Sequence, residues 1–168
     1  MAIGEEYVKV SELYSKMKES IVGTGWTAIS TSSKEDNITY TYTIGLYETY
    51  HIPELVVVGL SQDTACSILV EMVERIEEGE RLETMKRYKS RVEEYEDDEF
   101  VLIDVFDSKK EELMLIMEAY YGANFNEVKV LQVLWQDDAS LYPFQPLCDQ
   151  EAVRAQQLLG NVEITRLR

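Results

Sequence analysis

The sequence has few of the residues on which several common functions depend. Its 168 residues include two cysteines, three prolines and one histidine, and 16 basic residues stand against 32 acidic ones. The formal charge of −16 argues against nucleic acid or an anionic membrane as the main partner, because both require clustered Lys and Arg. The same charge favours a protein partner with a basic surface.

Cysteines and long apolar runs are also too sparse for a typical secreted or membrane protein. Cys66 and Cys148 are far apart and form no Cys-x-x-Cys motif, a usage typical of a reducing compartment. The first residues contain neither the basic nor the apolar segment of a signal peptide. Apolar runs such as residues 55–58 are too short to cross a bilayer. We therefore expect a cytoplasmic protein with reduced thiols and no membrane contact.

The motifs of the common enzyme and cofactor sites are missing as well. No Gly-x-Gly-x-x-Gly or Walker sequence is present to hold phosphate groups. Ser61 follows an apolar segment, but Asp63 replaces the second glycine of a nucleophile elbow, so we expect Ser61 to cap a helix. A single histidine without a cysteine pair does not match a zinc site. We expect no metal and no cofactor.

The apolar residues that are present follow helical and strand periods. They predict helices at residues 6–21, 61–79, 108–121 and 152–159, and strands at residues 26–31, 38–46, 55–60, 100–106 and 128–135. Ser108 is the expected cap of the third helix, residues 47–53 are expected to be a loop, and residues 80–99 fit a short strand or a surface excursion. The pattern predicts one α+β domain over residues 1–168, with a mixed, largely antiparallel β-sheet opened by a hairpin and helices packed on it.

Tyrosines gather near the predicted hairpin. Tyr40 and Tyr42 alternate with threonines, so they share one face of the sheet with Ile38 and Ile44. The whole sequence contains 11 tyrosines, whose large rings and polar tips suit a binding surface. The same properties suit a partly exposed sheet face, and both interpretations stay open.

Two residues are candidates for acid–base chemistry. His51 carries the one imidazole, whose ordinary pKa lies near neutrality, and Glu48 and Glu54 are close enough in sequence to orient it. Asp104 is a polar residue inside an apolar strand, where an unpartnered group would cost on the order of a few kcal/mol. Its carboxylate is therefore expected to be satisfied locally, to face solvent or to line a pocket.

Gln132 raises the same question in the last strand. The residues that would form a polar-aromatic cleft are Tyr40, Tyr42, His51, Asp104, Gln132 and Trp135. Such a cleft is one interpretation of these side chains, and purely structural roles are the other.

Acidic residues concentrate in the middle of the chain. Residues 71–99 contain twelve acidic and six basic residues, and residues 93–99 are almost continuously negative. Such a run is typical of a solvated segment, and it also suits a docking surface for a basic protein. On the second interpretation, Glu94, Glu96 and Asp98 are the candidate contacts.

Several segments together resemble one known family. They are Gly25-Trp26, Tyr-Thr-Ile-Gly-Leu at 42–46, Pro-Glu-Leu-Val-Val at 53–57, Gly59-Leu60, Leu-Gln-Val-Leu-Trp-Gln-Asp at 131–137 and Tyr-Pro-Phe-Gln-Pro at 142–146. The chain resembles, over residues 23–160, the bacterial and phage family called domain of unknown function 4262. The resemblance implies a compact single domain and supplies no activity. Many family members place His directly before Pro-Glu-Leu, where this chain has Ile52 after His51.

These observations favour a non-enzymatic interaction module that binds a protein partner, as an inhibitor or an immunity-like factor. The alternative is a small-molecule or nucleotide binding protein, or a hydrolase, that uses the polar-aromatic cleft. The sequence leaves the strand order and the oligomeric state open.

Overall fold

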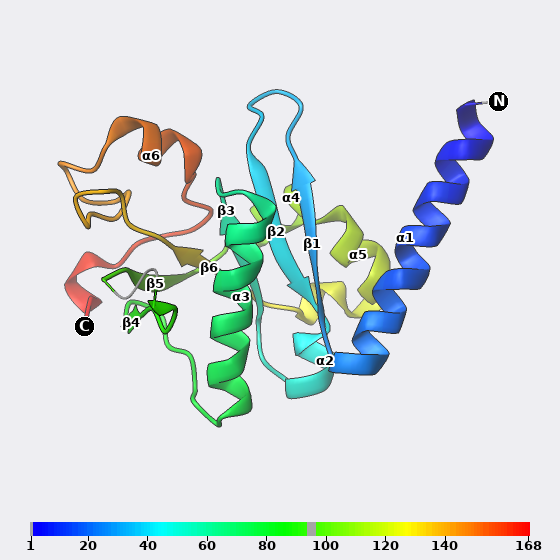
Figure 1. Ribbon diagram of the computed structural model, residues 1–168, viewed down its shortest axis with the longest axis horizontal. Coiled ribbons are helices and arrows are strands. Elements are labelled where there is room, and N and C mark those ends of the chain that lie inside the picture. The colour runs from blue at the N-terminus through cyan, green and yellow to red at the C-terminus, as the bar shows by residue number, and fades with distance from the viewer. Residues whose placement is uncertain (1, 94–96) are drawn as a thin grey trace.

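A mixed six-stranded sheet with helices on both faces organises the protein (Figure 1). The computed structural model describes residues 2–93 and 97–168, with side chains from residue 11 onward. The predicted contacts Glu94 and Glu96 lie outside the described residues.

The strands are β1 (Thr27–Ser32), β2 (Thr39–Ile44), β3 (Glu54–Val58), β4 (Arg87–Lys89), β5 (Glu99–Asp104) and β6 (Val130–Leu134). Their order across the sheet is β1-β2-β3-β6-β5-β4. Strands β1 and β2 form the expected antiparallel hairpin, and β3 with β6 is the parallel pair. The remaining neighbours are antiparallel. The predicted fold class, α+β with a mixed and largely antiparallel sheet, is confirmed.

The α-helices are α1 (Ala2–Thr24), α2 (Leu46–Tyr50), α3 (Gln62–Glu77), α4 (Asp107–Leu113), α5 (Leu115–Tyr121) and α6 (Gln150–Ala155). The 3-10 helix η2 (Gly122–Glu127) follows α5, and the 3-10 helix η3 (Ile164–Arg166) lies just before the last two residues. Ser61 caps α3 as predicted, because its side chain accepts the Thr64 N–H at 3.3 Å.

The predicted loop at residues 47–53 is wrong, because α2 occupies its first part. Gly45 precedes this helix in the left-handed region, at φ 113°. In the first turn, the Tyr47 N–H donates a hydrogen bond to the carboxylate of Glu54 at 3.1 Å. A side chain from the next strand thus supports the helix start, a contact with no local sequence signal.

The single helix predicted at residues 108–121 is also wrong in two details. Phe106, not Ser108, is the residue before α4, and no side chain caps that helix. The backbone leaves the helical region at Met114, with φ −113° and ψ 52°, and α5 begins directly after it. Met114 and Met117 are both fully buried, so core packing has overridden the continuous helix that the sequence pattern favours.

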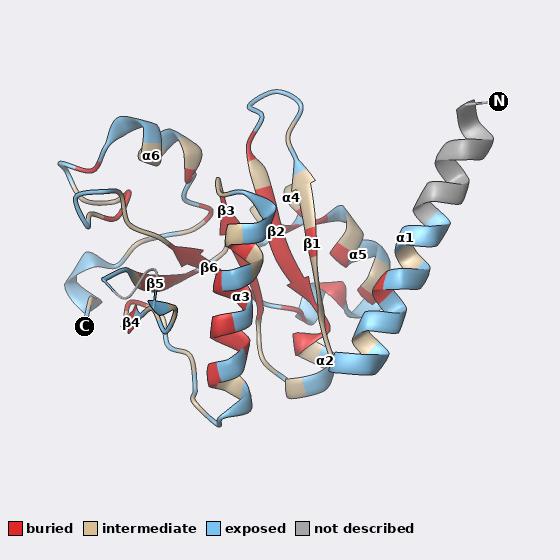
Figure 2. Cartoon of the chain, in the orientation of Figure 1, coloured by how far each residue is buried: buried red, intermediate tan, exposed pale blue. Residues whose placement is uncertain are grey.

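Two large apolar cores lie on the two faces of the sheet, and a smaller cluster joins β5 and β6 to Tyr142. One joins the hairpin tyrosines to α1, α4 and α5, and the other joins the opposite face to α3. Figure 2 shows α3 buried along one side and exposed along the other. All five residues of β3 are buried, which agrees with a strand covered on both faces.

Candidate functional site

A buried carboxylate connects two of the segments that carried the family resemblance, residues 42–46 and 53–57. Glu54, at the start of β3, is completely buried. Its Oε2 accepts the Thr43 hydroxyl at 2.6 Å, and its Oε1 accepts the N–H groups of Gly45 at 2.9 Å and Tyr47 at 3.1 Å. The hydroxyl of Tyr121 on α5 also donates to Oε1. The end of β2, the start of α2, β3 and α5 therefore meet at one side chain.

The groups around this carboxylate are themselves fixed. Thr43 Oγ1 accepts the Leu55 N–H at 2.8 Å, and the Tyr121 hydroxyl accepts the Gly45 N–H at 2.9 Å. The Tyr121 ring stands edge-on to Tyr47, with centroids 5.6 Å apart. Each donor is satisfied inside the protein, which indicates a structural role for the network.

Burial governs the titration of these two groups. Desolvation raises the pKa of Glu54, and its four hydrogen bonds oppose part of that rise. Burial and then the neighbouring Glu54 carboxylate raise the pKa of Tyr121. Neither group lines the pockets described below, so neither is placed to meet a ligand there.

The hairpin tyrosines are internal residues. Tyr42 is fully buried in the core, and burial raises its pKa to about 12. Tyr40 is also buried, and its hydroxyl donates to Gln157 Oε1 at 3.3 Å. Gln132 is buried too, donating to the Gln157 carbonyl at 2.7 Å and accepting the Leu159 N–H at 2.8 Å. These contacts attach the C-terminal segment to the sheet.

The structure does not bring the six residues of the predicted cleft together. Tyr40 and Tyr42 belong to the core on the α5 side, and Gln132 faces the same way as its partner Val56 in that core. Trp135 packs on the α3 side instead. The sheet separates the two groups, because alternate residues of a strand point to opposite faces.

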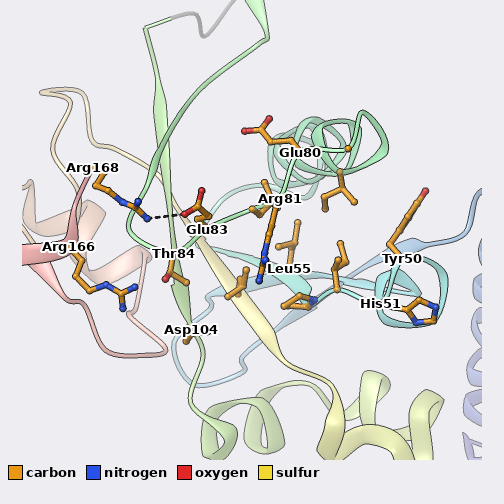
Figure 3. A pocket seen from close by; sticks show the side chains of 16 residues that line it. Tyr50, His51, Leu55, Glu80, Arg81, Glu83, Thr84, Asp104, Arg166 and Arg168 are labelled. Carbon is orange, nitrogen blue, oxygen red and sulfur yellow. Dashed lines mark hydrogen bonds and ion pairs between the residues drawn. The ribbon is translucent and has the colours of Figure 1, made fainter.

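His51 and Asp104 do share one pocket, of about 980 Å³. We call it the arginine pocket, because Arg81, Arg166 and Arg168 line it together with them (Figure 3). His51 ends α2 in the left-handed region, at φ 56°. The carboxylates expected to orient it are engaged elsewhere, since Glu48 accepts the Tyr120 hydroxyl at 2.9 Å and Glu54 is in the buried network.

The three arginines were missed in the sequence. Arg81 follows α3, whereas Arg166 and Arg168 come from the last residues of the chain. Nothing in their spacing indicates that the sheet brings them to one place.

Trp135 and Asp98 line a second, smaller hollow of about 120 Å³ between α3 and the ends of β5 and β6. Its apolar lining comes from Leu60, Ile68, Val92, Phe100 and Trp135. Asp98 belongs to the lining, and burial and the neighbouring Asp97 and Asp138 raise its pKa. We call this feature the acid-rimmed hollow.

The floor of the acid-rimmed hollow is held by hydrogen bonds. The Trp135 indole N–H donates to the Val58 carbonyl at 2.8 Å, and its backbone N–H donates to Gln156 Oε1 at 2.7 Å. The Glu99 N–H donates to Gln136 Oε1 at 3.1 Å. The hollow is thus preformed in its present shape.

Three further properties concern the described part of the chain. Among residues 2–93 and 97–168, no three His, Cys, Asp or Glu side chains are placed to hold a metal ion. Within the same ranges, no helix has the length and apolar character needed to cross a membrane. Cys66 and Cys148 are free thiols.

Comparison with curated proteins and with solved structures gives no match to the chain. A family model described as "Domain of unknown function (DUF4262)" matches residues 20–149. The match includes the buried Glu54 network and the lining of the acid-rimmed hollow, and it ends before Arg166 and Arg168 of the arginine pocket. The chain therefore belongs to the DUF4262 family.

Proposed function

We propose that this protein is a non-enzymatic binding module that holds a basic segment of a protein partner at the acid-rimmed hollow. The observation that carries the proposal is the position of Asp98, with Asp97 and Asp138 close to it, beside an apolar hollow lined by Trp135. An apolar centre with a polar rim is the usual arrangement of a protein-binding interface.

The size of the hollow limits what enters it. Pockets for whole small molecules measure roughly 300–1,000 Å³, whereas this one measures about 120 Å³. It suits a single aliphatic side chain of a partner. The partner segment is then an apolar residue flanked by Lys or Arg, whose charges lie over the aspartates.

The hydrogen-bonded floor of the acid-rimmed hollow also favours binding, because its side chains need little rearrangement when a partner enters. Trp135 is fixed at both its indole and its backbone N–H, so an entering side chain meets a surface that is already ordered. The chain's charge of −16 speeds the approach of a basic partner through long-range attraction.

A synthetic peptide with one leucine between two pairs of lysines tests the proposal. We expect it to shift the NMR signal of the Trp135 indole N–H and to saturate. Replacing the leucine by serine should weaken binding about tenfold or more, because a buried leucine contributes about 1.5–3 kcal/mol.

Paired charge reversals provide the control. The double variant Asp98→Lys with Asp138→Lys should weaken the peptide's binding at least tenfold. The control, Glu111→Lys with Glu118→Lys, changes the net charge by the same amount at exposed positions of α4 and α5 and should weaken binding less. Equal weakening by both pairs would show a general charge effect and contradict a specific site. Binding without any shift at Trp135 would contradict it as well.

A further inference from the structure

The arginine pocket combines an apolar wall with charges of both signs. Ile52 and Pro53 come from the segment before β3, and Ile76 and Leu82 come from the end of α3 and the loop after it. All four are half-buried. The pocket therefore offers apolar surface to a ligand of small-molecule size, since its volume of about 980 Å³ lies at the upper end of the usual range.

Most of the charged groups in this pocket already have partners. Glu80 lies 3.4 Å from Arg75, 3.7 Å from Arg91 and 3.8 Å from Lys86. Glu83 pairs with Arg168 at 3.0 Å, as Figure 3 shows.

After one further ion pair is counted, one positive and one negative lining residue remain in the described part of the chain. Arg166 pairs with Glu163 at 2.9 Å. Within the described part of the chain, Arg81 and Asp104 are the lining residues of opposite charge that have no ion pair within 4.0 Å. Figure 3 shows Arg81 extending across the pocket from the loop after α3, and Asp104 at the end of β5.

We propose that the arginine pocket binds a small zwitterion with an apolar side chain, an amino acid or a short peptide. Its carboxylate is held by the Arg81 guanidinium, which offers a fork of N–H donors, and its ammonium group by the Asp104 carboxylate. The apolar side chain lies against Ile52, Ile76 and Leu82. This site is separate from the acid-rimmed hollow and does not depend on the proposed partner.

The charge inventory disfavours simpler ligands. A phosphate or another plain anion would face the unpaired Asp104 carboxylate, and a plain cation would face the unpaired Arg81 guanidinium. A zwitterion satisfies both groups. Because it has no net charge, the negative field of the whole chain does not repel it.

Calorimetric titration of the full chain with phenylalanine and two blocked analogues tests this inference. We expect phenylalanine to bind, and phenylalanine amide and N-acetyl-phenylalanine each to bind at least tenfold more weakly, since each analogue lacks one of the two charges. The dipeptide leucyl-phenylalanine distinguishes a free amino acid from a short peptide as the natural ligand. It binds more tightly than phenylalanine if the natural ligand is a short peptide.

Two conservative variants assign the contacts. Arg81→Gln should reduce phenylalanine affinity to that of the amide and leave the amide's affinity unchanged. Asp104→Asn should reduce the affinity for phenylalanine to that of N-acetyl-phenylalanine and leave the affinity for N-acetyl-phenylalanine unchanged. Both residues are exposed, so the variants keep the wild-type Tm, and Arg154→Gln, an exposed arginine on α6 outside this pocket, is the matched control.

Three results would overturn the inference. These are the absence of heat with both zwitterions, equal binding of phenylalanine and its blocked analogues, and preferential binding of inorganic phosphate or adenosine monophosphate. None of them bears on the lysine-flanked peptide, whose binding is followed at Trp135. A failure here is therefore distinguishable from a failure of the proposed function.

Discussion

Replacing Glu54 with alanine should destabilise the folded protein by about 4 kcal/mol, because each buried donor left without an acceptor costs about 1–3 kcal/mol. The change leaves the hydroxyls of Thr43 and Tyr121 and the N–H group of Tyr47 without their acceptor, and it leaves a cavity at the start of β3. Urea unfolding followed by tryptophan fluorescence measures the loss.

Glu118→Ala is the matched control, because Glu118 is an exposed glutamate on the neighbouring α5. It should leave the unfolding midpoint unchanged. If Glu54→Ala lowered the free energy of unfolding no more than this control, the hydrogen-bond network around Glu54 would have no structural role.

The pH dependence of stability provides an independent check on Glu54. Burial raises its pKa in the folded state above the unfolded value, so its carboxyl group stabilises the fold fully below the unfolded pKa. That contribution is lost as the pH rises through the folded pKa. The free energy of unfolding of the wild type, relative to Glu54→Gln, should therefore decrease as the pH rises from about 4. If this difference in the free energy of unfolding grew with pH, the hydrogen bonds would lower the pKa of Glu54 by more than burial raises it.

Gly45→Ala should destabilise the protein by about 3 kcal/mol. Gly45 adopts φ 113°, where a side chain is strained, and an added Cβ would lie 2.6 Å from the Gly25 carbonyl oxygen and 2.8 Å from Trp26 Cα. Both are backbone atoms, so relief requires movement of the chain between α1 and β1. Thermal and urea unfolding of the variant measure the effect.

Gly23→Ala is the control with the opposite sign. Gly23 lies within α1 and an added Cβ would meet nothing within 4 Å, so alanine should stabilise the protein by up to about 1 kcal/mol. Equal effects at Gly23 and Gly45 would contradict the close approach of the two backbones at Gly45.

The elements that the sequence predicted well are those whose signals are local. The alternation of Tyr40 and Tyr42 with threonines identified β2, and Ser61 identified the start of α3. The burial of both tyrosines was not predicted, because the sequence favoured a binding surface or a partly exposed sheet face for them. The failures at α2 and Met114 have the opposite cause. Glu54 supports α2 from the next strand, and core packing breaks the helix at Met114.

The candidate sites were predictable only in part. Asp104 was singled out as a polar residue in an apolar strand, and the pocket that it shares with His51 agrees with one of the alternatives for it. Gln132 was singled out for the same reason, yet it is satisfied by backbone groups of the C-terminal segment. Arg81 and Arg166 gave no signal, because their proximity depends on how the last residues of the chain bond to the backbone of Met85 and Arg87.

The family segments build the buried network around Glu54, and the proposed function places the partner at the acid-rimmed hollow. The dissociation constant of the lysine-flanked leucine peptide tests it most directly, measured for the wild type and for Ser67→Leu. Ser67 is an exposed residue of α3 that lines the hollow, so leucine there fills the hollow without changing the charge. A rise in the dissociation constant of about tenfold at unchanged Tm is the predicted result. An unchanged dissociation constant would contradict the claim.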